Sequence, residues 1–320
     1  MLKIGKLKLN KPYILAPMAG ITDLPFRMLN REFGCELAFV EMLNARSLGH
    51  NSKKTKHMLS TCPGDKPLGV QLLGCEPDFI LKGMDVLSKY KYDILDFNAA
   101  CPAKKVIRRG EGASLLKDPG KLSKILKLVV KNAKTSVTVK VRAGWDKDSA
   151  PVKDIVLAVQ DAGVDALFIH GRYKAQEYSG QPDYKLIAQA KKVLNIPLIA
   201  SGDIFSGPLA KKMFDETGCD AVAVARGSLG NPWIFKEIDS YLKNGKLPVR
   251  PNPAKVLLTA TKHLDMCIDF YGEQVGIVIF RKFFAWYTKG FRNIRPLREA
   301  CSRIKTRQEA VSLFEQLKKR

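Results

Sequence analysis

The sequence has few of the features that mark membrane-spanning, secreted or metal-binding proteins. Its longest stretch without a charged residue, Pro12–Thr22, has 11 residues, whereas a spanning helix needs roughly 18. The seven cysteines contain no Cys-x-x-Cys pair, which disfavours both a disulfide framework and a zinc ribbon. The four histidines, His50, His57, His170 and His263, have no acidic or thiol partner at metal-binding spacing. We therefore expect a cytoplasmic protein with no metal site and no membrane partner.

Acidic residues are also scarce relative to basic ones. The 320 residues include 54 Lys+Arg and 31 Asp+Glu, which gives a formal net charge of +23. Such an excess is typical of proteins that bind a polyanion, either nucleic acid or an anionic membrane surface. The alternative is a lysine coat that only keeps the surface soluble. Lysines 121, 124, 127, 131 and 134 favour that alternative locally, because they lie on the outer face of one predicted amphipathic helix.

Short apolar, β-branched runs alternate with helix-period segments through the first three quarters of the chain. Eight of these runs predict strands: Ile14–Ala16, Leu37–Val40, Leu68–Leu72, Ile94–Phe97, Val137–Val141, Ala166–Ile169, Leu198–Ala200 and Ala221–Val224. Eight strands alternating with helices predict an α/β fold, a (β/α)8 TIM barrel over residues 1–243. The competing doubly wound sheet usually carries a Gly-x-Gly-x-x-Gly turn after an early strand, and the sequence has none.

A different organisation begins at residues 244–253, which form a linker dense in Pro, Gly and Asn. The strand signals stop there, and residues 254–320 predict a C-terminal all-α helical bundle. Asn252-Pro253 is a suitable helix start, with helices expected over 254–271 and 274–289. A further helix is expected behind the capping box Thr306-Arg307-Gln308-Glu309.

Basic and aromatic residues are interleaved in the segment Arg281–Arg307, which has nine basic residues and one acid. This combination suits phosphate contact together with stacking on exposed bases. The alternative is an ordinary helix that buries its aromatic residues, which is the interpretation we favour for Phe283 and Trp286. Arg292, Arg295 and Arg298, spaced by three, are the better ligand candidates.

Polar or reactive residues follow nearly every predicted strand, where TIM barrels place their chemistry. They are Pro17 to Gly20, Glu41, Gln71, Asn98, Cys101, Lys140, Arg142, His170, Arg172, Ser201 to Asp203 and Ala225 to Gly227. The last two groups stand where such barrels bind phosphate, with glycines for close backbone approach and Arg226 for charge, although glycines also make ordinary tight turns. Lys140 is suited to stabilising an anion or to pairing with an acid, and His170 to a ligand role or a structural one.

Cys101 is the candidate catalytic residue. It stands three residues after the strand-end residue Asn98, whereas an isolated cysteine elsewhere is more often a small buried apolar residue. No histidine lies nearby in the sequence to generate a thiolate. An unperturbed thiol stays protonated at neutral pH, so Cys101 is suited to act as a general acid.

The segments Ala16–Asp23, Gln71–Gly74, Asp96–Val106, Lys140–Arg142, His170–Arg172 and Ser201–Ile204 resemble tRNA-dihydrouridine synthases in residues, order and spacing. The resemblance is greatest to the bacterial B-type subgroup and includes Arg281–Tyr287 in the tail. The chain departs from the family pattern at Ala100, Ser201, Ala225 and Phe283.

This resemblance implies an FMN-dependent oxidoreductase with an FMN-binding barrel and a tRNA-binding helical domain. NADPH would reduce the flavin, hydride would pass from flavin N5 to uridine C6, and Cys101 would protonate C5. With Ala19 and Gly227 added from the strand ends, the expected cofactor-binding residues are Pro17, Met18, Ala19, Gln71, Lys140, His170, Ser201, Gly202, Asp203, Ala225, Arg226 and Gly227. The expected substrate-binding residues are Asn98, Arg142, Arg172, Lys104, Lys105, Arg281, Lys282, Arg292, Arg295 and Arg298.

The loop Ala103–Leu116, with four basic residues and two glycines, is interpreted as a mobile lid, the alternative being a solvated charged loop. We expect a monomer with tRNA as its partner. Two other functions stay open: a flavin barrel that acts on a free pyrimidine or small enone, and an RNA-binding module without catalysis.

Overall fold

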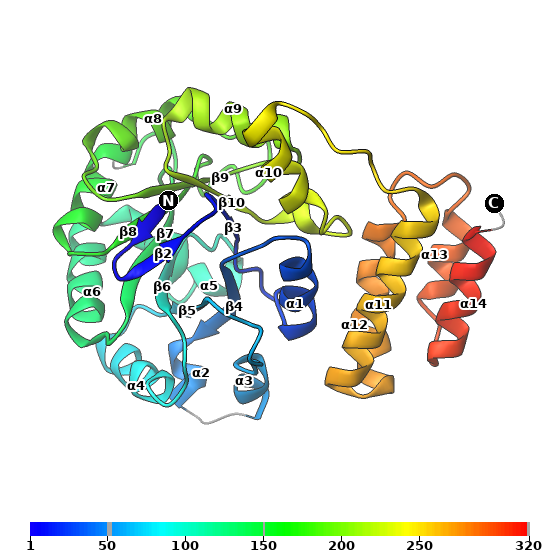
Figure 1. Cartoon of the computed structure of the whole chain (residues 1–320). Coiled ribbons are helices and arrows are strands. Elements are labelled where there is room, and N and C mark those ends of the chain that lie inside the picture. The colour runs from blue at the N-terminus through cyan, green and yellow to red at the C-terminus, as the bar shows by residue number, and fades with distance from the viewer. Residues whose placement is uncertain (50–52, 150, 319–320) are drawn as a thin grey trace.

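The computed structural model of the chain describes residues 1–49, 53–149 and 151–318. Its centre is a closed barrel of eight parallel strands, in the order β10-β3-β4-β5-β6-β7-β8-β9 (Figure 1). The strands are β3 (Tyr13–Leu15), β4 (Ala38–Asn44), β5 (Leu68–Leu73), β6 (Ile94–Ala99), β7 (Ser136–Arg142), β8 (Ala166–His170), β9 (Leu198–Ser201) and β10 (Ala221–Val224). Each corresponds to one predicted strand, so the predicted (β/α)8 barrel is confirmed.

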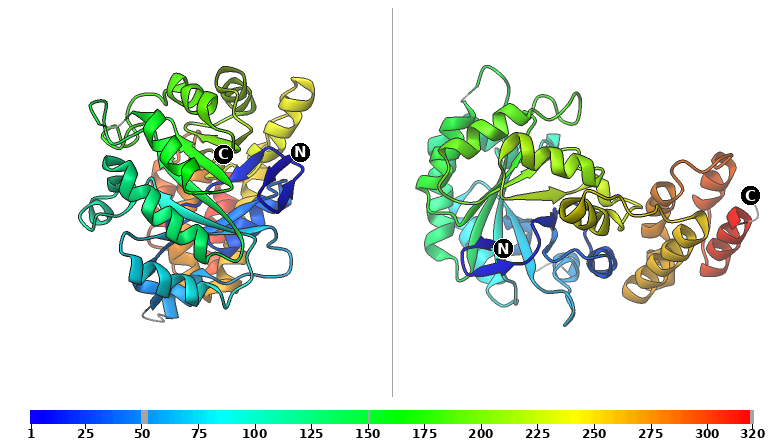
Figure 2. Two further views of the ribbon diagram at one scale, coloured as in Figure 1. Left: turned by 90° about the vertical axis from the view of Figure 1, so that its left-hand side faces the viewer. Right: turned by 45° about the horizontal axis from the view of Figure 1, so that its top comes forward.

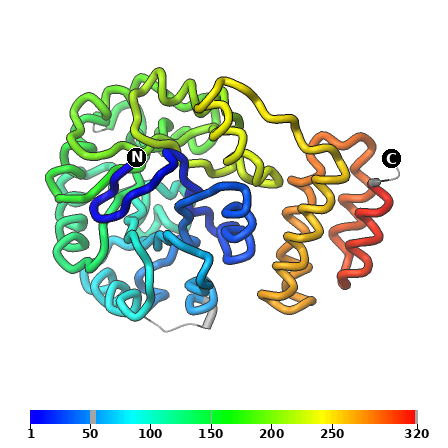
Figure 3. The backbone as a smooth tube through the Cα atoms, viewed as in Figure 1, coloured from blue at the N-terminus to red at the C-terminus, as the bar shows by residue number. Residues whose placement is uncertain are grey.

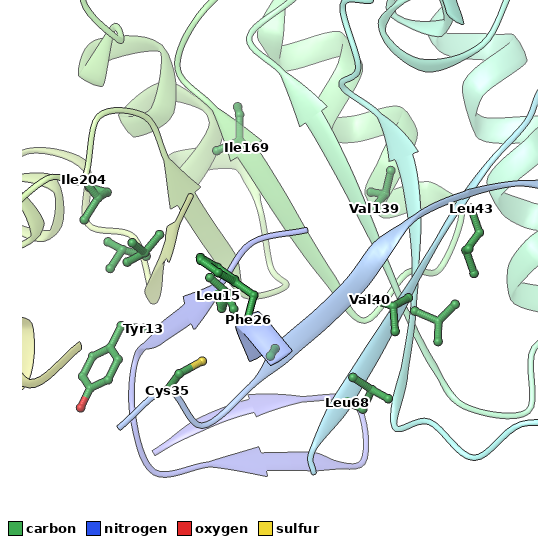
Figure 4. Packing of buried hydrophobic residues seen from close by; sticks show 14 of the residues in the cluster. Tyr13, Leu15, Phe26, Cys35, Val40, Leu43, Leu68, Val139, Ile169 and Ile204 are labelled. Carbon is green, nitrogen blue, oxygen red and sulfur yellow. The ribbon is translucent and has the colours of Figure 1, made fainter. Parts of the chain in front are cut away.

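Helices surround the barrel and cover the outer faces of its strands (Figure 2). They are α1 (Leu24–Glu32), α2 (Ala45–Gly49), α3 (Lys53–Met58), α4 (Pro77–Leu87), α5 (Lys104–Ile107), α6 (Pro119–Asn132), α7 (Val152–Asp161), α8 (Tyr184–Val193), α9 (Gly207–Thr217) and α10 (Ile234–Asn244), with 3-10 turns η1 (Gly112–Lys117) and η2 (Arg226–Ser228). The barrel strands are buried on both faces and are therefore continuous apolar runs. Strand side chains such as Leu15, Val139 and Ile169 share one cluster with helix residues such as Phe26 (Figure 4).

An N-terminal hairpin, which the sequence analysis did not predict, covers the amino-terminal end of the barrel. Its strands β1 (Leu2–Ile4) and β2 (Leu7–Leu9) are antiparallel. Leu2, Ile4 and Leu9 pack with barrel-interior residues such as Phe39 and Phe168. The hairpin thereby covers this end of the barrel.

The C-terminal helices form a separate layer beside α1, reached through a segment without helix or strand after α10 (Figure 3). They are α11 (Pro253–Tyr271), α12 (Glu273–Tyr287), α13 (Arg295–Cys301) and α14 (Arg307–Lys318), so a helical C-terminal region is present as predicted. The ring of Phe26 on α1 stacks on Phe283 of α12 at 5.5 Å. The Tyr271 hydroxyl donates to the Asp23 carboxylate at 3.0 Å. Among the described residues, no helix is long and apolar enough to cross a bilayer.

Candidate active site

A cavity of about 370 Å³ opens at the carboxyl ends of the barrel strands. All of the predicted cofactor-binding residues line it, together with Asn98, Cys101 and Arg142. This convergence follows from the fold, because every parallel strand of a barrel ends at the same face. Trp286 of α12 also lines the cavity, whereas the sequence interpretation placed it in the helical core. Phe283 is fully buried, as that interpretation expected.

A chain of hydrogen bonds runs from the barrel interior to the backbone of Cys101. The buried Asp96 accepts from Thr138 Oγ1 at 2.6 Å and from Gln71 Nε2 at 2.7 Å. Asn98 Nδ2 donates to Gln71 Oε1 at 2.8 Å, and its Oδ1 accepts from the backbone N–H of Cys101 at 2.9 Å. Gln71 and Asn98 are thereby fixed in one orientation. The sequence analysis assigned no role to Asp96.

The thiol of Cys101 is held in its protonated form. Burial raises its pKa, an effect that a backbone N–H and Arg142 partly oppose and that Glu111 reinforces. The loop around it is fixed on both sides: Arg142 Nε donates to the carbonyl of Ala100 at 2.9 Å, and the N–H of Ala113 to the carbonyl of Cys101 at 3.1 Å. A protonated thiol at a fixed point of the cavity can deliver a proton to a bound substrate.

Lys140 brings a cation into the same cavity. Its ammonium donates to Ser201 Oγ at 3.1 Å. Burial lowers the pKa of Lys140 to about 8, against the attraction of Asp96. Burial likewise raises the pKa of Asp96 to about 6, although its hydrogen bonds oppose this shift. Lys140 makes no ion pair with the described residues, so its charge is directed at the cavity.

The loops after β9 and β10 bring main chain close to the cavity. A Cβ at Gly227 would lie 2.0 Å from the carbonyl oxygen of Ile204, and one at Gly202 would lie 2.8 Å from Pro182. Only glycine fits at these two points. Asp203, with φ +50°, accepts from Arg226 Nη2 at 2.6 Å and from Arg172 Nη1 at 3.1 Å. The two guanidinium groups thus converge beside main chain of the kind that binds phosphate.

His170 is neutral, since burial and then Arg142 lower its pKa to about 2. Arg142 and Arg172 are both buried and hold the loop after β8. Arg142 donates to the carbonyls of Tyr173 and Glu177, and Arg172 to those of Ser179 and Gly180. Arg172 does not line the cavity itself. These arginines therefore set the shape of the cavity wall.

The segment predicted as a mobile lid has two different halves. Lys104 and Lys105 are exposed on α5, whereas Leu115 and Leu116 are buried in the core. Glu111, also buried, accepts from Asn44 Nδ2 at 2.9 Å. Burial ties residues 111–113 and 115–116 to the barrel, whereas Ser114 is half-buried. The surface part of the segment is residues 103–110, and there the mobile lid stays a prediction.

The basic residues of the C-terminal helices lie outside the cavity and differ in their surroundings. Arg281 donates to the carbonyl of Ile304, and Arg298 donates to those of Ala285 and Thr288. Arg292 and Arg295 are exposed. Lys282 donates to the carbonyl of Gly20 in the barrel.

The described residues contain no group of three or more His, Cys, Asp or Glu side chains arranged to hold a metal ion. His50, named in the sequence analysis, lies outside the described residues.

Comparison with known proteins identifies the family. The family described as Dihydrouridine synthase (Dus) matches residues 14–320. The chain belongs to the dihydrouridine synthase family. Members of this family are oxidoreductases, so the prediction of an enzyme of this class is confirmed.

Relatives from several bacteria match over most of their length. A probable tRNA-dihydrouridine synthase from Rickettsia conorii is 38% identical over 301 residues, which cover 94% of this chain and 91% of the relative. A tRNA-dihydrouridine synthase B from Pasteurella multocida is 36% identical over 314 residues, with 98% and 95% covered. The expected similarity to the B-type subgroup is confirmed.

Solved structures of low sequence identity share the barrel. A histamine dehydrogenase from Rhizobium sp. 4-9 superposes with a TM-score of 0.61 at 12% identity, over 83% of this chain and 50% of that one. A 6-hydroxypseudooxynicotine amine oxidase from Pseudomonas geniculata N1 gives a TM-score of 0.60 at 15% identity, with 75% and 49% covered. At these identities the likeness concerns the fold alone.

Proposed function

We propose that this dihydrouridine synthase uses FMN and NADPH to reduce the C5–C6 double bond of a D-loop uridine in tRNA, as a cytoplasmic monomer. The observation that carries the proposal is the Cys101 thiol, kept protonated by burial and fixed in the same cavity as the Lys140 cation. The family match and the relatives named for tRNA support the choice of substrate.

The cavity fits FMN in its chemistry and size. Its volume of about 370 Å³ falls within the roughly 300–1,000 Å³ of small-ligand sites. The close main-chain approach at Gly202 and Gly227, beside Arg226, suits a phosphate group. Lys140 suits the anionic edge of a ring that gains electrons, while Met18 and Ala19 offer apolar contact.

The reduction adds one hydride and one proton across the double bond, and bound FMN supplies the hydride chemistry with electrons drawn from NADPH. Cys101 donates its thiol proton to C5 of the uracil ring and regains a proton from solvent. Asn98 holds the backbone of Cys101 at 2.9 Å and keeps the thiol at a constant position. Arg142 and Arg172 maintain the cavity wall beside the base.

A uridine inside a folded tRNA must leave its stack to reach this cavity, at a cost of a few kcal/mol. Contacts between basic residues and phosphates would offset that cost. Lys104 and Lys105 are exposed on α5, Arg292 is exposed in the turn between α12 and α13, and Arg295 is exposed at the start of α13. We propose these four as the main phosphate contacts and retain Arg281 and Arg298 as weaker candidates; Lys282, whose ammonium donates to the Gly20 carbonyl, is not among them.

The decisive experiment compares Cys101→Ala with Cys62→Ala, a partly exposed cysteine away from the cavity. We expect both variants to bind flavin and accept electrons from NADPH. Loss of a general acid should slow dihydrouridine formation in Cys101→Ala about 10²- to 10⁴-fold, with Cys62→Ala unchanged. Mass spectrometry of digested tRNA measures the two-mass-unit gain. A wild-type rate in Cys101→Ala would contradict the proposed acid.

A second measurement tests the substrate. Binding to tRNA should weaken steeply with salt, in proportion to the number of phosphates contacted. Equal activity on free uridine, with no salt dependence, would favour a flavin barrel for small molecules. A colourless protein that binds RNA without any flavin would instead favour an RNA-binding module.

A further inference from the structure

The loop between β3 and α1 lies between the cavity and the C-terminal helices. Its residues Pro17, Met18 and Ala19 line the cavity. Its last residue, Asp23, caps α1 by accepting from the N–H of Phe26 at 2.9 Å. Gly20 stands midway, with φ +71° and nothing within 4 Å of where a Cβ would be. Thr22 holds the main chain of Met18, whose N–H donates to Thr22 Oγ1 at 3.1 Å, but Gly20 has no side chain of its own to hold it in place.

Two side chains from distant elements hold the main chain of Gly20 instead. Its N–H donates to Glu41 Oε2, and its carbonyl oxygen accepts from Lys282 Nζ. Glu41 is on β4, where the pairing with β5 shifts register between Phe39 and Met42. Such a bulge re-aims a side chain, which accounts for a carboxylate directed at the neighbouring loop. Lys282 is on α12, in the C-terminal helices.

Charges of both signs surround this arrangement. Burial and the nearby Asp23 carboxylate raise the pKa of Glu41, and the Gly20 N–H and the Lys282 ammonium act against that shift. The Lys282 ammonium also makes the buried carboxylate of Asp23 easier to ionise. Hydrogen bonds to ionised groups are roughly twice as strong as neutral ones. The Lys282 ammonium therefore restrains Gly20 more firmly than a neutral donor would.

The helix that supplies Lys282 also supplies part of the cavity wall. Trp286 follows Lys282 by four residues, so the two share one face of α12, and Trp286 lines the cavity. α12 lies so close to the barrel that a Cβ at Gly230 would be 2.4 Å from the carbonyl carbon of Trp286. One helix thus both contacts the loop and closes the cavity.

We propose that Glu41 and Lys282 are positioning residues that clamp Gly20, so that the β3–α1 loop presents Met18 and Ala19 to the cavity when α12 is docked. Lys282 then acts on the loop rather than on an RNA phosphate. The clamp involves only residues of this chain, whereas its effect on flavin binding rests on the proposed function.

The test uses the full chain with paired variants. Lys282→Met and Glu41→Met remove the donor and the acceptor, whereas Lys282→Arg and Glu41→Gln keep hydrogen-bonding groups of similar reach. Lys255→Met, at an exposed site on α11, removes an equal charge from the C-terminal helices and serves as the control. Circular dichroism establishes that each variant is folded.

Hydrogen exchange read by mass spectrometry on peptides covering residues 17–23 is the first measurement, and it needs no cofactor. We expect exchange about tenfold faster in both Met variants, and near wild type in Lys282→Arg, Glu41→Gln and Lys255→Met. Unchanged exchange in both Met variants would overturn the clamp. If only one of the two Met variants is folded, the exchange rate of that variant decides whether the clamp is supported.

The second measurement separates the clamp from an RNA contact. We expect Lys282→Met to weaken flavin binding about tenfold, with the slope of tRNA affinity against salt unchanged. A slope smaller by about 1, with unchanged flavin binding, would identify Lys282 as a phosphate contact and overturn the proposal. Faster exchange in a chain that binds no flavin at all would support the clamp and contradict the proposed function.

Discussion

The close approach of α12 to the barrel leaves no room for a side chain at position 230. Gly230 has φ +63°, and an added Cβ would lie 2.4 Å from the carbonyl carbon of Trp286 and 2.5 Å from the backbone nitrogen of Tyr287. Ordinary contact begins near 3.4 Å. Because both neighbours are main-chain atoms, we expect Gly230→Ala to push α12 and the segment that carries residue 230 apart by about 1 Å.

Two costs add in this variant. A left-handed alanine costs roughly 1–2 kcal/mol, and forcing an extra carbon into a well-packed interface costs typically about 1–3 kcal/mol. Gly245→Ala isolates the first cost, because Gly245 has φ +68° with nothing within 4 Å of an added Cβ. We expect Gly230→Ala to lose about 2–5 kcal/mol of unfolding free energy and Gly245→Ala about 1–2 kcal/mol.

Thermal and urea unfolding followed by circular dichroism measure the difference. Each kcal/mol should lower Tm by roughly 2 °C in a chain of this size. Flavin binding provides a second readout, since movement of α12 withdraws Trp286 from the cavity; it should weaken in Gly230→Ala only. Equal losses of stability in the two variants would refute the close docking of α12 and the role of Trp286 in the cavity wall.

The remaining predictions concern charged side chains. Because the pKa of Lys140 is lowered to about 8, its ammonium loses its proton above that pH. The rate of dihydrouridine formation should therefore fall above that pH, while the Cys101 thiol is still protonated. In Lys140→Arg the fall in rate should move to higher pH. Asp65 is fully buried between Arg27 and Arg31, so Asp65→Asn should lower the free energy of unfolding in urea by about 3–5 kcal/mol. Asp265→Asn, which breaks an exposed ion pair with Arg307, should lower it by under about 1 kcal/mol. Arg298→Met should lower Tm, because three acceptors at the C-terminal end of α12 lose their hydrogen-bond donor. Arg292→Met should leave Tm unchanged and should reduce the slope of tRNA affinity against salt concentration by about 1.

The barrel could be predicted because its strands are buried on both faces and therefore appear as uninterrupted β-branched runs. The hairpin β1–β2 escaped prediction, although Leu2, Ile4, Leu7 and Leu9 alternate with lysines at the period of a strand. Three residues per strand are too few to distinguish this alternation from a charged terminus. The hairpin is recognised by the barrel end that it covers, and this end forms only when the eight strands have assembled into a barrel.

Most of the cavity lining could be predicted for a related reason. Once eight parallel strands are assigned, the residues that follow them must meet at one face, so Gln71, Lys140 and His170 are brought together by topology alone. Asp96 was missed because it lies inside a strand, although its position two residues before Asn98 puts both side chains on the same face. Glu41 and Trp286 acquire their positions from a bulge and from helix docking, which no local pattern records.

The spacing of basic residues in the sequence does not show which of them are able to bind RNA. An arginine that binds a phosphate and one that binds main-chain carbonyls use the same donors, and a stripe of arginines has the same spacing in both cases. Arg142, Arg172 and Arg298 direct their guanidinium groups at carbonyls of this chain, whereas Arg292 and Arg295 are exposed. The burial of each arginine distinguishes these two roles. A guanidinium that is hydrogen-bonded inside the protein must break its hydrogen bonds before it can bind RNA. The arginines that can bind a polyanion are therefore fewer than the arginines in the sequence, and the exposed basic residues that we assign to RNA are Lys104 and Lys105 on α5 together with Arg292 and Arg295 near the C-terminus.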